Sequence, residues 1–265
     1  MKLNYKPTSK KCSILNSARV VAIGLIAGLV LLGSTNSFAI PIEQDLKKFS
    51  VSHNTEFQPL IAQWEKKYGK KAIPDLLKVA KNKKAKDTDR FIAIMAITKI
   101  SGTSGAHQII PFIKDKNWMV RSAALKSIEI LDYKPGSKHV LKLLKDPALV
   151  IRAQAVSTIE TLKPEGSTEA LLSAVYDPKN YRTGNYKKGK ADWVPQRALA
   201  VLRKLRPIGV SAKLLPLMND AHDRKLRAHA LYTIETLEGK SLKKGSAFAE
   251  RSLAWNQALR TTVRQ

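Results

Sequence analysis

The residues best suited to chemistry lie in a short stretch, 179–193, that combines aromatic rings with basic side chains. Aromatic rings stack on sugars or bases, while Lys and Arg neutralise phosphate or carboxylate groups. A merely tolerated polar insertion is the competing interpretation, because lengthening a loop costs little free energy. Trp193 is also a candidate core residue, since it directly precedes a helix start at Val194-Pro195. The candidate binding residues are Tyr181, Arg182, Tyr186, Lys187, Lys188, Lys190 and Trp193.

A second basic set is the alternative binding site. Lys138, Lys142 and Lys145 share one face of a predicted helix, with His139 nearby. Spacings of three and four residues bring side chains together on a helix. The sequence alone does not choose between this face and the 179–193 stretch.

Catalytic and metal-binding patterns are missing from the sequence. The five His residues are scattered, with no pair four residues apart and no carboxylate at metal-ligand spacing. Neither a nucleophile elbow, a phosphate-binding loop nor a dinucleotide fingerprint occurs. We therefore predict a protein that is not an enzyme and that carries no cofactor and no metal.

The elements that must position these residues are helices that recur with Ala in a constant place. Counting from five anchor residues, Ala follows at the third position and apolar residues at the fourth, seventh and tenth. These offsets fall on one stripe of an α-helix. The anchors recur every 31 or 32 residues, except for one interval of 43, and such a period is typical of stacked repeats. The anchors are Arg90, Arg121, Arg152, Pro195 and Arg227, and the alanines are Ala93, Ala124, Ala155, Ala198 and Ala230.

Each repeat continues into a second helix after a Pro- or Gly-containing breaker, and four of these second helices close on an Asp. We expect about six helix pairs over 57–240, with 179–193 as an insertion and 57–80 as a degenerate first pair. A terminal cap without the repeat pattern is predicted over 241–265, with its helix at about 246–262. The closing residues are Asp115, Asp146, Asp177 and Asp220.

This pattern resembles the HEAT-repeat family, in particular short bacterial HEAT-like repeats of about 31 residues. The residues that carry the resemblance are Asp115 with Val120-Arg121 and Ala124-Leu125, and their counterparts in the next and last repeats: Asp146, Ile151-Arg152, Ala155-Val156, Asp220, Leu226-Arg227 and Ala230-Leu231. The resemblance implies an all-α, right-handed α-solenoid of stacked helix pairs with a C-terminal capping helix. It implies little about activity, because one fold serves many functions.

The resemblance also suggests roles for the charges that recur along this chain. The Arg anchors invite interpretation as a phosphate-binding row, but in the family this Arg lies between stacked repeats and bonds to the Asp that ends the preceding helix. That relation would pair Asp115 with Arg121, Asp146 with Arg152, and Asp220 with Arg227. The family also places second helices on the concave side, which would put Lys138, Lys142 and Lys145 in a groove.

The N-terminus has the order of a secretory signal peptide. A basic start is followed by the apolar run 20–32 and a small polar stretch that ends at Ala39. We predict a signal peptide over 1–39 with cleavage after Ala39, followed by a linker over 40–56. The alternative is an uncleaved membrane anchor, although thirteen apolar residues fall short of the roughly 20 that span a bilayer.

Charge and cysteine content narrow the class of partner. The only cysteine, Cys12, precedes the predicted cleavage point, so the mature chain has neither disulfides nor thiolate chemistry. The signal segment holds 5 of the 47 basic residues, and its removal leaves 42 against 21 acidic residues, a formal charge of +21. Such an excess favours anionic partners and fast electrostatic capture.

These observations support three functional hypotheses. The first is an exported, periplasmic or secreted, non-catalytic adaptor that binds an acidic protein or an anionic envelope polymer. The second is a HEAT-like nucleic-acid-binding or DNA-glycosylase-like protein, against which the export signal argues. The third is a structural envelope protein held to a negatively charged membrane or wall by its charge.

Overall fold

Helices account for the regular structure of the part of the chain that the computed structural model describes, residues 42, 44–46 and 57–262. Within these residues no β-strand forms, and the one β-type pairing is an isolated antiparallel bridge between Tyr181 and Ala191. The predicted signal peptide lies outside the described residues. The all-α prediction is confirmed.

The segment 40–56, which we predicted as a linker, contributes to the core where it is described. Ile42 and Leu46 are buried, and the Asp45 carboxylate accepts a 2.6 Å hydrogen bond from the Tyr68 hydroxyl. Apolar side chains four residues apart share one side of a helical turn, and both belong to the hydrophobic core. These residues therefore extend the hydrophobic core toward the N-terminus.

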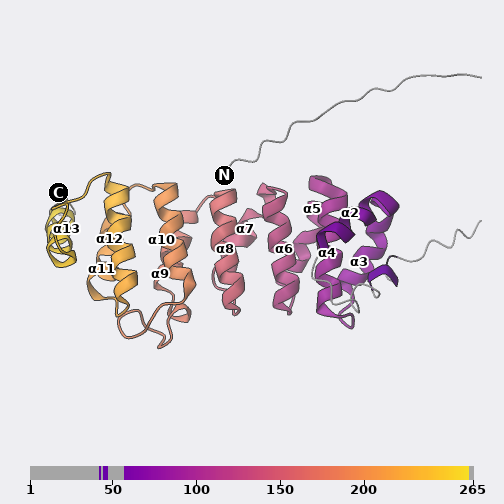
Figure 1. Ribbon diagram of the computed structural model, residues 1–265, viewed down its shortest axis with the longest axis horizontal. Coiled ribbons are helices and arrows are strands. Elements are labelled where there is room, and N and C mark those ends of the chain that lie inside the picture. The colour runs from indigo at the N-terminus through magenta and orange to yellow at the C-terminus, as the bar shows by residue number, and fades with distance from the viewer. Residues whose placement is uncertain (1–41, 43, 47–56, 263–265) are drawn as a thin grey trace, which may run out of the picture. The chain divides into compact units, whose positions relative to one another are not determined.

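Five helices that carry the Ala stripe stand side by side in a row within the unit 40–265 (Figure 1). Each of them packs directly against the next one along the chain. Together they form an α-solenoid, as the period predicts. The row consists of α4 (Asp87–Ser101), α6 (Trp118–Ile130), α8 (Leu149–Leu162), α10 (Trp193–Leu205) and α12 (Arg224–Glu238).

The partner helices are shorter and pack against the row. Pro111 and Pro216 lie near the starts of two partner segments, where proline is accommodated because the first N–H groups of a helix need no internal acceptor. These segments are α5 (Ala106–Ile109) with η3 (Ile110–Lys114), α7 (Ser137–Leu143), α9 (Ser167–Tyr176), and η6 (Ser211–Leu214) with α11 (Leu215–Asp220). The breakers η2 (Gly102–Gly105) and η4 (Lys134–Gly136) precede α5 and α7.

Contacts between successive helices are concentrated in the row rather than in the partner layer. This difference follows from the longer row helices and their small buried alanines. The concave position of Lys138, Lys142 and Lys145 stays a prediction.

The row can pack closely because of its alanines. Ala93, Ala124, Ala155, Ala198 and Ala230 are all fully buried, at 0% exposure. A methyl group lets neighbouring helix backbones approach, while the larger apolar residues at the fourth and seventh positions fill the space between the layers. The tenth position lies nearer the edge, since Leu131, Leu205 and Leu237 are only partly buried.

The two ends of the array differ from its middle. The first pair is α2 (Phe57–Tyr68) and α3 (Ile73–Lys81), joined by η1 (Gly69–Ala72). The last helix, α13 (Phe248–Thr262), packs on α11 and η6 and buries Trp255 at 1% exposure. Its start and end lie close to the predicted capping helix.

Candidate functional site

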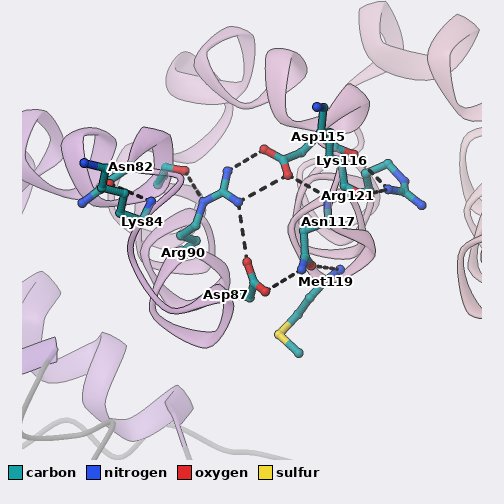
Figure 2. A network of polar contacts seen from close by, with 10 residues as sticks. Asn82, Lys84, Asp87, Arg90, Asp115, Lys116, Asn117, Met119 and Arg121 are labelled. Carbon is teal, nitrogen blue, oxygen red and sulfur yellow. Dashed lines mark hydrogen bonds and ion pairs between the residues drawn. The ribbon is translucent and has the colours of Figure 1, made fainter.

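The anchor arginines hold the repeats together by polar contacts that Figure 2 shows for Arg90 and Arg121. Arg90 donates to the Asp115 carboxylate through Nη1 and Nη2, at 3.3 and 2.5 Å, and to the Ala80 carbonyl through Nε at 2.9 Å. Arg121 makes a two-point contact with Asp146, at 2.7 Å from Nε and 2.6 Å from Nη2. These paired, buried guanidinium groups are not available to bind phosphate.

The pairing follows a different rule from the one expected. Arg121 bonds to the preceding Asp115 only through that residue's backbone carbonyl, at 2.8 Å, and its carboxylate partner comes 25 residues later. Arg152 likewise takes the Asp146 carbonyl at 2.9 Å. The side chains of Asp115 and Asp146 therefore face the anchors of the repeats before them, Arg90 and Arg121. The predicted bonds of Arg121 to Asp115 and of Arg152 to Asp146 therefore form, but to the backbone carbonyls and not to the carboxylates.

The Arg–Asp ladder, formed by these contacts between successive repeats, changes at the insertion. Arg152 Nε donates to the Asn180 side chain at 2.7 Å and Nη2 lies 3.2 Å from Asp192, whereas Asp177 instead caps η5 (Pro178–Asn180). Burial raises the pKa of the Asp192 carboxyl, even though Arg152 and the Val194 N–H favour its charged form. A neutral amide has therefore replaced the carboxylate as the main partner of this anchor.

The last anchor departs from the pattern as well. The Arg227 guanidinium lies 5.6 Å from the centre of the Phe248 ring, and its buried Nε has no hydrogen-bond partner among the described residues. Asp220, its expected partner, lies 3.3 Å from the Lys187 ammonium. The prediction that Asp220 pairs with Arg227 is therefore wrong.

The 179–193 insertion is an ordered loop. The Tyr181–Ala191 bridge, a 3.1 Å bond from the Arg182 N–H to the Lys190 carbonyl and a 2.9 Å bond from the Asp192 N–H to the Asn180 carbonyl close its two ends. At its tip, the His222 N–H donates to the Tyr186 carbonyl at 2.9 Å and ties the loop to the next repeat. Backbone hydrogen bonds therefore fix the positions from which its side chains project.

Three tyrosines support this loop from inside. Tyr181 is 5% exposed, and its hydroxyl donates to the Val175 carbonyl. Tyr186 meets Tyr176 edge-on, with ring centres 5.3 Å apart, and lies 6.3 Å from the Tyr181 ring. Burial is the main cause that raises the pKa of both Tyr176 and Tyr181. The expected stacking role of Tyr181 is corrected, because its ring lies in the core, and the half-buried Tyr186 is held by the other two.

The basic side chains of the loop point outward. Arg182, Lys187, Lys188 and Lys190 are exposed. Lys187 lies 3.3 Å from the Asp220 carboxylate and 5.9 Å from the Tyr186 ring centre. The other three have no ion-pair partner in the described part of the chain. The loop thus presents its cations from backbone positions that hydrogen bonds fix.

Trp193 lies on the surface, whereas Tyr181 lies in the core. Trp193 is 61% exposed at the first position of α10, where the Asp192 side chain accepts the Val194 N–H at 2.8 Å. That cap fixes the helix start, and the indole projects from the first helical residue into solvent. The alternative that Trp193 packs in the core is wrong.

The basic residues of the alternative binding site lie beside a groove of the partner layer. Lys138, Lys142 and Lys145 are exposed, and Lys142 and Lys145 line a hollow of about 440 Å³ between α7 and α9. Glu169 lines the same hollow and reduces its positive charge. Burial lowers the pKa of His139, followed by the nearby Lys138, Lys114 and Lys142, so the neutral imidazole is favoured. This site is less uniformly basic than the loop.

Comparison with known proteins identifies a repeat family in part of the chain. The HEAT-repeat family matches residues 73–160, which include the three Arg anchors with regular spacing. This part of the chain consists of HEAT repeats. No match to a curated protein is found. Among solved structures, the complex of CpcE and CpcF of phycocyanin lyase from Nostoc sp. PCC7120 is similar, with 14% identity, a TM-score of 0.41, and coverage of 88% of this chain and 100% of that chain.

The sequence did not predict one further candidate site on the repeat array. A cleft of about 350 Å³ lies along α10 and α12, lined by Trp193, Gln196, Arg197, Ala200, Arg203 and His229. A comparison of equivalent positions in the repeats could have indicated it. Eight residues after the anchor, three other repeats carry Glu129, Glu160 and Glu235, whereas the fourth carries Arg203.

The side chains gathered at the loop and the cleft can make binding contacts. Among the described residues, no set of three or more His, Cys, Asp and Glu could hold a metal ion. Nor does any described helix have the length and apolar character needed to cross a membrane. The chemistry on the surface is that of guanidinium, ammonium and aromatic groups, which bind anions and planar or apolar groups.

Proposed function

We propose that this HEAT-repeat protein is an exported, non-catalytic adaptor that binds an acidic protein or an anionic polymer of the cell envelope. The observation that carries the proposal is the ordered loop, which holds Arg182, Lys188 and Lys190 in solvent without ion-pair partners among the described residues. A loop whose backbone is already formed loses less conformational entropy on binding than a mobile one. The loop is therefore suited to capture an anionic surface.

The rest of the molecule supports this proposal through its charge. The 47 basic residues outnumber the 21 acidic ones, and this excess remains after removal of the predicted signal segment. Long-range attraction of this kind raises the rate of encounter with anionic partners. Outside the cytoplasm, the anions in reach are acidic proteins, lipid headgroups and charged envelope polymers.

A capture experiment tests the proposal. The immobilised protein is incubated with an envelope extract of its source, and retained proteins and polymers are eluted with increasing salt. We expect retention to fall as salt rises, because screening weakens contacts between exposed charges. The triple variant Arg182→Ala, Lys188→Ala, Lys190→Ala should retain less and show a weaker salt dependence.

The matched control removes three exposed cations elsewhere: Lys66→Ala, Lys70→Ala and Lys81→Ala. Equal losses in the two triple variants would show that net charge alone causes retention, which contradicts a loop site. Recovery of nucleic acid alone would favour the nucleic-acid-binding alternative. Thermal unfolding of both variants checks that the fold is intact.

A further inference from the structure

The cleft between α10 and α12 differs from the remaining basic surface in the kind of residues that form it. Arg197 and Arg203 line it together with the exposed indole of Trp193, and no Lys and no carboxylate is among its lining residues. Tyr232, 57% exposed, adjoins it through Arg203. Trp, Tyr and Arg are the residues enriched at the energetic centres of protein interfaces, where Lys is depleted.

Arg203 is held in place before any ligand arrives. Its Nη1 donates to the Thr233 hydroxyl at 2.8 Å, and its guanidinium carbon lies 4.8 Å from the centre of the Tyr232 ring. A stacked and hydrogen-bonded guanidinium keeps its remaining N–H groups in a fixed direction. Planar donors of this kind suit the two oxygens of a carboxylate.

The positive charge of the cleft is specific to the fourth repeat. The position of Arg203 is occupied in other repeats by Glu129, Glu160 and Glu235. Glu129 accepts a hydrogen bond from Thr158, Glu160 from Lys204, and Glu235 from Ser241 and Arg251. Arg203 places a positive charge where these repeats have a negative one. Arg197, one turn before Ala200, is exposed and adds a second guanidinium to the same cleft.

The remaining lining residues limit the size of the occupant. Ala200 of α10 and His229 of α12 also line the cleft, and Ala200 contributes only a methyl group. A volume of about 350 Å³ accommodates a few side chains and not a folded surface. The cleft also adjoins the end of the 179–193 loop, so a ligand attracted by the loop cations would reach it directly.

We propose that this cleft binds a short acidic segment of a partner protein, with carboxylates held by Arg197 and Arg203 and an apolar side chain packed against Trp193. The inference rests on the proposed adaptor function and deepens it, because it selects a protein over an envelope polymer. Charge complementarity carries the choice of an acidic ligand. The Arg, Trp and Tyr composition carries the choice of a protein.

The binding test uses a fluorescein-labelled peptide of alternating Glu and Phe as its probe, with anisotropy as the readout. We expect Arg197→Glu to weaken binding by about tenfold or more. The control Arg260→Glu makes the same charge change at an exposed position of α13 outside the cleft, and should weaken binding by less than about threefold. Equal weakening by both variants would overturn the proposal in favour of diffuse attraction.

The apolar contact has its own matched pair. Trp193→Ala should weaken binding by about tenfold, whereas Trp118→Ala, which removes an exposed indole from the same first-turn position of α6, should leave it unchanged. No effect of Trp193→Ala would overturn the predicted apolar contact. Tighter binding of an oligothymidylate of equal charge, lost in Arg197→Glu but not in Arg260→Glu, would overturn the choice of a protein ligand.

The capture experiment separates this inference from the proposed function. A partner retained from the extract by Arg197→Glu as well as by the unchanged protein, but lost by the loop triple variant, would overturn the cleft and leave the adaptor function standing. An extract that yields no salt-sensitive partner would contradict the adaptor function, even if the peptide binds.

Discussion

At the scale of single residues, the polar contacts between repeats are the features that most tightly specify the stacking. The side chains of Arg121 and Asp146 are 9% and 4% exposed, and two hydrogen bonds join them. Burying one charge without its partner costs far more than the pair contributes when intact. Variants at such positions should therefore have large effects.

Removal of the Asp146 carboxylate should destabilise the protein strongly. We expect Asp146→Ala to lower the free energy of unfolding by about 3–5 kcal/mol, because it leaves the Arg121 guanidinium buried without a counter-charge. Urea unfolding followed by circular dichroism measures the change. Asp75→Ala breaks an exposed pair with Lys78 and should cost no more than about 1 kcal/mol. Similar losses in the two variants would contradict a structural role for the ladder.

Asp115 predicts how stability depends on acidity. Burial acts to raise the pKa of this carboxyl, but hydrogen bonds from Arg90 and from the Asn117 N–H outweigh it and hold the pKa below its ordinary value of 3.8. A lowered folded-state pKa means that the contribution is present above the unfolded-state value and is lost as pH falls through the folded-state value.

We therefore expect the melting temperature to fall on acidification below about pH 4, and Asp115→Asn to make this decline shallower while lowering stability at neutral pH. Melting temperatures measured from neutral pH downward test this. A variant whose acid decline runs parallel to that of the unchanged protein would show that other carboxylates dominate.

At the scale of elements, the close approach of the row helices depends on small side chains. Ala155 of α8 is fully buried where the row helices pack together. We expect Ala155→Leu to destabilise by about 1–3 kcal/mol through overpacking. Ser157→Leu adds the same side chain to an exposed position of α8 and should change stability by less than about 0.5 kcal/mol. Chemical unfolding compares the two, and an unaffected Ala155→Leu variant would mean that the interface can yield.

The insertion illustrates how a loop can be ordered by its own aromatic residues. The edge-on contact of Tyr176 with Tyr186 joins α9 to the loop, and the Tyr176 hydroxyl donates to the Lys213 carbonyl of the next repeat at 2.6 Å. These contacts leave the cations of the loop outside and its rings largely inside. The tyrosines of the insertion therefore support the loop and do not form a platform on which a ligand could stack.

At the scale of the whole molecule, the N-terminal segment and the charge belong together in the proposed function. Ala39 closes a basic, apolar and small-residue sequence typical of export. We expect N-terminal sequencing of protein purified from its source to begin near Ile40, in a fraction outside the cytoplasm. Recovery of an intact Lys10-Lys11 segment on the mature protein would contradict cleavage and favour an anchor.

The sequence by itself determined the repeat architecture, because helical packing acts through local periodicity. The Ala positions, the breakers and the terminal cap each follow from residues within a few turns of one another. The fully buried alanines confirm that interpretation. The irregularity of the fourth repeat was also visible in the sequence, as Pro195 at the anchor position and a longer interval before it.

Tertiary structure decided the partners of those residues. Arg121 reaches Asp146 rather than the Asp115 carboxylate, Tyr181 enters the core and Trp193 leaves it. Such outcomes depend on the direction in which a side chain projects between two stacked elements, and spacing along one chain does not contain that direction. The cleft of Arg197 and Arg203 arises for the same reason, since α10 and α12 form it only when they lie side by side.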